Sequence, residues 1–134
     1  MARLTGLQTL NLAGAKLGDA GVAALAPLVE LKQLELNSTP VTDAGMAVVP
    51  RMAKLEALYM NRTGVTDAGM AALVGPPLHR VTVSDTVVGD PGLLTLAQIS
   101  TMTFIIAARS RATAAGAAAA LAVPGRNAAL RISI

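Results

Sequence analysis

The fold is decided by residues 31–45, which read LKQLELNSTPVTDAG, and by the return of this phrase at residues 55–69 as LEALYMNRTGVTDAG. The phrase also opens at Leu7 and, in a looser form, at Leu78. The four openings lie 24, 24 and 23 residues apart. A phrase that returns at a short and nearly constant interval is the sequence signature of a solenoid, in which each repeat forms one layer.

The first half of each repeat predicts a short strand. Apolar residues occupy its first, fourth and sixth positions, and the last two of these point to the same face of a strand. One such strand cannot bury its apolar face alone, whereas stacked copies form a parallel sheet over a shared core. The apolar positions hold Leu7, Leu10 and Leu12, then Leu31, Leu34 and Leu36, then Leu55, Leu58 and Met60, then Leu78, Val81 and Val83.

The second half of each repeat predicts a turn and a short helix. An aliphatic residue precedes the sequence Gly/Thr-Asp-Ala/Pro-Gly, in which the Asp keeps its register through all four repeats. A carboxylate at a helix start accepts free backbone N–H groups and meets the positive end of the helix dipole. We therefore expect each Asp to cap the helix of its own repeat. The aspartates are Asp19, Asp43, Asp67 and Asp90.

These features together resemble the leucine-rich-repeat family, and the Thr-Asp-Ala-Gly turns resemble a bacterial variety of it, over residues 4 to about 101. The resemblance implies an α/β solenoid with a curved parallel sheet on its concave side and short helices on its convex side. It also implies a non-enzymatic scaffold that binds another protein on the concave sheet face. The partner's identity does not follow from the resemblance.

The resemblance has one departure. The family consensus has Asn three residues after the third apolar position, where its amide bonds the backbones of neighbouring loops. Because a Thr hydroxyl offers fewer donors than an amide, we expect a thinner ladder of bonds between these repeats. The residues at this place are Ala15, Thr39, Thr63 and Thr86.

The whole chain, residues 1–134, is predicted to form a single domain. Its hydrophobic content of 53% is ample for a core, and its charged content of 14% is too low for a disordered chain. The tail is less regular, with Ala114 in place of the Asp, and either caps the solenoid or frays. The repeats are residues 7–30, 31–54, 55–77 and 78–101, followed by a degenerate repeat at 102–129 and a closing strand at about 130–132.

The start of the chain predicts an uncovered apolar edge. Residues 4–7 correspond to the end of a helix in the later repeats, and no polar capping repeat precedes the first strand. Solenoids generally need terminal caps for solubility. Two alternatives to recognition therefore stay open: structural self-assembly through this edge, and a chain that is a fragment of a larger leucine-rich-repeat protein.

The candidate binding surface is the sheet face that points away from the core. Alternation along the strand turns residues 9, 11 and 13 outward where Leu10 and Leu12 turn inward. Both aromatic residues of the chain, Tyr59 and Phe104, fall on this face. Aromatic residues and Arg dominate binding energy at interfaces, so we expect a patch centred on Tyr59. The predicted partner-binding residues are Asn11, Gln33, Glu35, Asn37, Tyr59, Asn61, Arg80 and Thr82.

This patch has a purely structural alternative, because a half-polar, solvent-facing strand face is expected of any such solenoid. Catalytic patterns are weak. His79, the chain's one His, lies near Ser84 and Asp85 in the sequence, but no nucleophile elbow surrounds them. The chain has no Cys, and each repeat supplies one carboxylate where Ca²⁺ needs several oxygen ligands. We therefore predict no catalytic, cofactor-binding or metal-binding residues.

Charge and hydropathy favour a protein partner over nucleic acid or a membrane. The net charge is +3, and residues 91–134 hold four Arg and no acid. Four charges in a tail with almost no aromatic residues are a weak signal for nucleic-acid binding. The apolar runs are shorter than the roughly 20 residues of a membrane span, and the N-terminus does not resemble a signal peptide. These features slightly favour a cytoplasmic location.

Overall fold

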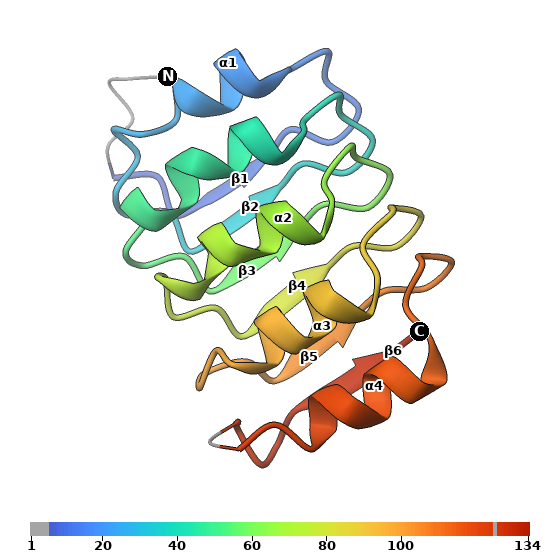
Figure 1. The fold of residues 1–134 in the computed structure, drawn as a ribbon. Coiled ribbons are helices and arrows are strands. Elements are labelled where there is room, and N and C mark those ends of the chain that lie inside the picture. Colours follow the sequence, from blue (N-terminus) through green and yellow to red (C-terminus); the bar gives the residue numbers. More distant parts are fainter. Residues whose placement is uncertain (1–5, 125) are drawn as a thin grey trace.

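The computed structural model describes residues 6–124 and 126–134, which form a solenoid of parallel strands backed by helices (Figure 1). Six strands lie side by side in chain order, and each pairs in parallel with the next. The predicted α/β solenoid with a parallel sheet is confirmed. The strands are β1 (Thr9–Asn11), β2 (Gln33–Glu35), β3 (Ala57–Tyr59), β4 (Arg80–Thr82), β5 (Phe104–Ile106) and β6 (Arg131–Ser133).

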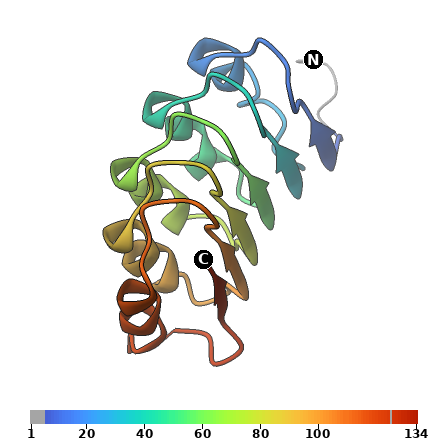
Figure 2. The same cartoon turned by 90° about the vertical axis from the view of Figure 1, so that its right-hand side faces the viewer.

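Helices form a second layer that covers the inner, apolar face of the sheet, as the turned view in Figure 2 shows. In the second and third repeats, 3-10 turns replace part or all of the α-helix. Pro50 lies inside the longer of these turns, where its missing N–H cannot make an α-helical bond. The helices are α1 (Asp19–Ala23), η1 (Asp43–Arg51), α2 (Asp67–Met70), η2 (Ala71–Val74), α3 (Asp90–Ala97) and α4 (Ala114–Leu121).

The core runs unbroken through the repeats because the strands pair in step. Leu34 lies opposite Leu10 on one neighbouring strand and opposite Leu58 on the other. Leu34 and Leu58 are fully buried, whereas Leu10 on the edge strand β1 and Leu12 just after it are partly exposed. A leucine at this position of the strand is thus fully buried when a repeat packs on each side of it. Residues 4 and 5, which begin the stretch 4–7 where the sequence suggested the end of a preceding helix, lie outside the described residues.

The aspartates of the repeat join neighbouring repeats and do not cap their own helices, which corrects the sequence prediction. Asp19 accepts the backbone N–H of Thr42 at 2.7 Å and its hydroxyl at 2.5 Å. Thr42 directly precedes the helix of the next repeat, so Asp19 satisfies a free N–H group at that helix start. The bond from the Thr42 hydroxyl, and to a lesser extent that from its N–H, holds the pKa of Asp19 below its ordinary value. Asp43 binds the N–H and hydroxyl of Thr66 in the same way.

The glycine of the Thr-Asp-Ala-Gly turn leaves room for the carboxylate that arrives from the preceding repeat. A Cβ at Gly69 would lie 2.3 Å from Oδ1 of Asp43, and a Cβ at Gly116 would lie 1.9 Å from Oδ1 of Asp90. Both distances are far shorter than a van der Waals contact. From the second repeat onward, the turn therefore receives the Asp of the repeat before it, whereas a Cβ at Gly21 in the first repeat would meet Leu17.

The C-terminal tail continues the solenoid. Thr113 precedes α4 and donates its N–H and hydroxyl to Asp90, at 2.7 and 2.8 Å. The same hydroxyl accepts the N–H of Gly116 at 3.0 Å, which caps α4. β6 pairs with β5, and Leu130 beside it is buried. Because Ala114 lies where the other repeats have Asp, this repeat receives a carboxylate and offers none.

Candidate functional site: the concave sheet face and its rim

Two rows of side chains cross the concave face, with one residue from each strand in each row. The strand register fixes their membership, and we name each row after one member. The Arg80 row contains Thr9, Gln33, Ala57, Arg80, Phe104 and Arg131, and the Tyr59 row contains Asn11, Glu35, Tyr59, Thr82, Ile106 and Ser133. Six of the eight predicted contact residues lie in these two rows.

In the Tyr59 row, half-buried Tyr59 lies between Glu35 and Thr82 on the neighbouring strands. Glu35 is also half-buried and accepts the side-chain amide of Asn37 at 3.1 Å. Thr82 is only 4% exposed, which corrects the expectation that it faces solvent, since the larger Tyr59 and Ile106 flank it in the row. Its hydroxyl has no hydrogen-bond partner among the described residues. In the middle of this row, Tyr59 and Glu35 are therefore accessible and Thr82 is not, while Asn11 and Ser133 are exposed at its two ends.

In the Arg80 row, a cation lies against an aromatic ring. The guanidinium carbon of Arg80 lies 4.9 Å from the ring centre of Phe104, which is a cation–π distance. Phe104 is 37% exposed, and Arg131 on its other side is exposed. Of the other predicted residues on this face, Gln33 is half-buried in the same row and Asn11 is exposed.

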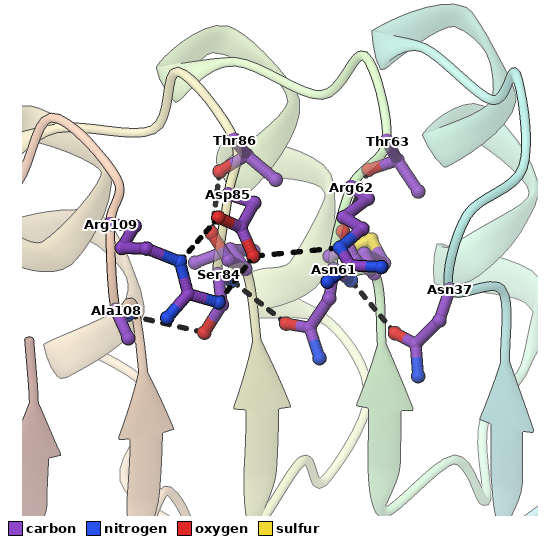
Figure 3. Close-up of polar contacts among 11 residues, drawn as sticks. Asn37, Asn61, Arg62, Thr63, Ser84, Asp85, Thr86, Ala108 and Arg109 are labelled. Atoms are coloured by element: carbon purple, nitrogen blue, oxygen red, sulfur yellow. Dashed lines mark hydrogen bonds and ion pairs between the residues drawn. The ribbon is translucent and has the colours of Figure 1, made fainter.

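Asn37 and Asn61, also predicted as contact residues, lie at the rim where the strands end, and their amide oxygens bond the next repeat (Figure 3). Oδ1 of Asn37 accepts the N–H of Asn61 at 2.8 Å, and Oδ1 of Asn61 accepts the N–H of Ser84 at 2.8 Å. The hydroxyl of Ser84 continues this ladder by accepting the N–H of Ala108 at 3.1 Å. These two asparagines therefore position the turns of neighbouring repeats.

This ladder corrects the prediction of where the repeats are bonded. The residues of this ladder come directly after the third apolar residue of each repeat. The Asn of the family consensus comes three residues after that apolar residue. The Thr hydroxyls at that third residue bond carbonyls within their own repeats. Thr39 donates to Leu36, Thr63 to Met60 and Thr86 to Val83.

Three charged residues line the rim beside the ladder, and sequence reasoning did not select them. Arg109 holds Asp85 with two bonds, at 2.6 and 2.7 Å, and Nε of Arg62 lies 3.7 Å from Oδ2 of Asp85 (Figure 3). The hydrogen bonds from Arg109 hold the pKa of Asp85 below its ordinary value. A surface hollow of about 310 Å³ lies over these residues and the neighbouring Asn61.

The rim residues share a left-handed backbone. Arg62, Asp85 and Arg109 have φ angles of 57°, 56° and 53°, and Gly14 has 74° at the equivalent place in the first repeat. This conformation costs a residue other than Gly on the order of 1–2 kcal/mol. Stacking holds it, since the N–H of Arg62 donates to the carbonyl of Ser84 in the next repeat at 2.9 Å. Only Gly14 carries a sequence signal for this turn.

The structure separates His79 from the residues that suggested a catalytic triad. His79 is exposed just before β4, whereas Ser84 and Asp85 follow the end of that strand. Five residues of extended chain span roughly 16 Å, so the three side chains do not form a hydrogen-bonded relay. Within residues 6–124 and 126–134, no three His, Cys, Asp or Glu side chains gather around a metal-sized space. In the same part of the chain, the helices are too short or too polar to cross a membrane.

Comparisons with known proteins agree with this architecture. A family model described as a leucine-rich repeat matches residues 4–26 and 51–74. A search of curated proteins by sequence found no match. Among solved structures, the fold is similar to that of an internalin from Listeria monocytogenes, with a TM-score of 0.56 at 13% identity. This similarity covers 98% of the chain and 48% of the internalin, so the chain spans about half of that protein's length. Two matched repeats and the stacked fold together support a leucine-rich-repeat protein.

Proposed function

We propose that the chain is a non-enzymatic recognition module that binds a partner protein on the concave face of its sheet, over β3, β4 and β5. One observation carries the proposal. The side chains of Tyr59, Arg80 and Phe104 gather on this face and make none of the hydrogen bonds that join the repeats. Protein recognition is also the role that the leucine-rich-repeat resemblance implies.

Some large or polar side chains bond neighbouring repeats and others do not, and this difference supports the same proposal. Asp43, Thr66, Asn37 and Asn61 are all engaged in bonds between repeats. The concave rows need no such bonds, because the strands pair through their backbones and pack through their other face. Large aromatic and Arg side chains on a rigid scaffold are the groups that most often dominate protein interfaces. We therefore assign binding to Tyr59, Arg80, Glu35 and Phe104, and positioning to the two asparagines.

A capture experiment tests the proposal against the alternative that the face is merely solvated. The full chain and its Tyr59→Ala/Arg80→Ala variant would serve as baits in an extract of the native organism. The variant should still fold, with at most a small fall in its urea midpoint, because it loses the Arg80–Phe104 contact and none of the hydrogen bonds between repeats. It should bind the protein captured by the wild type at least about tenfold more weakly.

A matched control removes the same kinds of group from the helical side. Arg51→Ala/Leu94→Ala also deletes one Arg and one exposed large side chain, at the end of η1 and on α3. It should bind the captured protein as the wild type does. Undiminished binding by the concave variant, with its fold intact, would discard the patch.

A further inference from the structure

We propose that the concave face selects a partner segment with two carboxylates about 10 Å apart and an apolar side chain between them. This inference rests on the proposed function, because it names the chemistry of the partner that the face would bind. Three consecutive members of the Arg80 row carry it: Arg80, Phe104 and Arg131. Sequence reasoning selected only the first of them as a contact residue.

The register sets the spacing of the two backbone positions that carry the cations. Arg80 pairs with Phe104, and Phe104 pairs with Arg131, on three successive parallel strands. Neighbouring strands lie about 4.8 Å apart, so the Cα atoms of the two arginines lie about 10 Å apart. The ring of Phe104, 37% exposed, lies between them, with the guanidinium of Arg80 4.9 Å from its centre, and its exposed part can contact an apolar side chain.

Neither arginine is paired with an acid within residues 6–124 and 126–134, although the guanidinium of half-buried Arg80 lies against the ring of Phe104. Along the two rows, the one described carboxylate belongs to Glu35, which lies on β2 and bonds Asn37. Glu35 is two strands away from Arg80 and four from Arg131.

The charge of the C-terminal repeats favours the same ligand. Residues 91–134 contain four Arg and no Asp or Glu. Although Asp85 pairs with Arg109, the other three form no salt bridge among the described residues, so the field over β5 and β6 attracts acidic groups. Arg also binds carboxylates through two parallel N–H bonds, which makes a fixed pair of arginines sensitive to the spacing of its acids. The site therefore has both the sign and the geometry to discriminate among partners.

An acidic amphipathic helix is the simplest segment that matches this geometry. With a rise of 1.5 Å per residue, side chains at positions i and i+7 of a helix lie on one face about 10.5 Å apart. An apolar residue at i+4 then lies between the two carboxylates, on the side that faces Phe104. A helix laid across β4, β5 and β6 would place each acid beside one arginine.

A designed peptide tests this inference with the full chain. The probe is a fluorescein-labelled, alanine-based helix with Glu at i and i+7 and Leu at i+4, and binding is read by fluorescence anisotropy. Arg80→Gln and Arg131→Gln should each weaken the affinity about tenfold. Arg111→Gln, which removes an exposed arginine from the turn before α4, should change it by less than about twofold. Moving the second Glu to i+3, or replacing both by Gln, should weaken binding to the wild type.

Three results would overturn the acidic selectivity. They are no binding of the probe by the wild type at about 1 mM, equal binding of the Gln peptide, and full affinity of Arg131→Gln. Circular dichroism of each variant confirms that its fold is intact. Because Arg131 is not altered in the capture experiment, the two proposals fail separately. If partner capture depends on Tyr59 and Arg80 while Arg131→Gln binds the peptide as the wild type does, the concave binding site is retained and its preference for acids is rejected.

Discussion

The variant Gly69→Ala is expected to lose about 2–4 kcal/mol of unfolding free energy, although Gly→Ala normally stabilises a helix. The added Cβ would lie 2.3 Å from Oδ1 of Asp43, so the carboxylate must move. Its displacement breaks the 2.7 Å bond from the N–H of Thr66 and the bond from the Thr66 hydroxyl. Equilibrium urea unfolding followed by circular dichroism measures the loss.

Gly75→Ala is the matched control for this substitution. Gly75 has φ −70° and ψ −54°, an ordinary helical conformation, and a Cβ there would lie 3.8 Å from Cα of Pro50, an ordinary van der Waals contact. This variant should be neutral or gain about 0.4–1 kcal/mol by restricting the unfolded chain. If Gly69→Ala were as stable as Gly75→Ala, the carboxylate would not be a required tie between the repeats.

The variant Leu58→Ala is expected to lose about 3–5 kcal/mol of unfolding free energy, because it opens a cavity in the middle of the stack. Leu58 is fully buried and lies opposite Leu34 on β2 and Val81 on β4. The relatively rigid strand spacing limits how far these neighbours can collapse into the space. The urea midpoint should therefore fall, with an unchanged slope if the chain still unfolds as one unit.

Leu10→Ala makes the same chemical change where the stack offers less burial. Leu10 is partly exposed on β1 and has a described strand on one side, with Leu34 as its partner. The expected loss is about 1–2 kcal/mol, since less apolar surface leaves the core. Equal losses at the two positions would contradict a core whose burial is completed from both sides.

The sequence was sufficient to predict the stacked architecture. The strand positions follow from the alternation in phrases such as Leu34-Glu35-Leu36, and the parallel order follows because each repeat buries its apolar face against the next. Leu34, Leu58 and Val81, which define the predicted core, pair in register and are fully buried. Fixed spacing is informative here because a solenoid converts the period of the sequence directly into a repeat distance in space.

The direction of the polar contacts could not be predicted in this way. A bond from Asp43 to its own helix and a bond from Asp43 to the next repeat have the same sequence period. Periodicity therefore predicts a role for the Asp in every repeat, but it does not tell whether the Asp bonds its own helix or the next repeat. The amides of Asn37 and Asn61 pose the same ambiguity, and their place at the end of a strand made them look like free surface groups.

The exposure of side chains on the concave face also could not be predicted from the alternation of residues along each strand. Alternation assigned Thr82 to the outward side correctly, yet its exposure depends on Tyr59 and Ile106, which are distant in sequence and adjacent in the sheet. The same dependence on neighbouring strands brings Arg131 beside Phe104. The left-handed turns of Arg62 and Asp85 were missed because only Gly14 displays the residue type that this conformation prefers.

Site-specific photo-crosslinking tests the concave site most directly. p-Benzoylphenylalanine would replace Tyr59 on the sheet face in one protein and Ala47, exposed on η1, in another. After irradiation in an extract of the native organism, position 59 should yield a covalent adduct with the captured protein, and position 47 should yield none. An adduct of that protein formed from position 47 and absent from position 59 would contradict binding on the concave face.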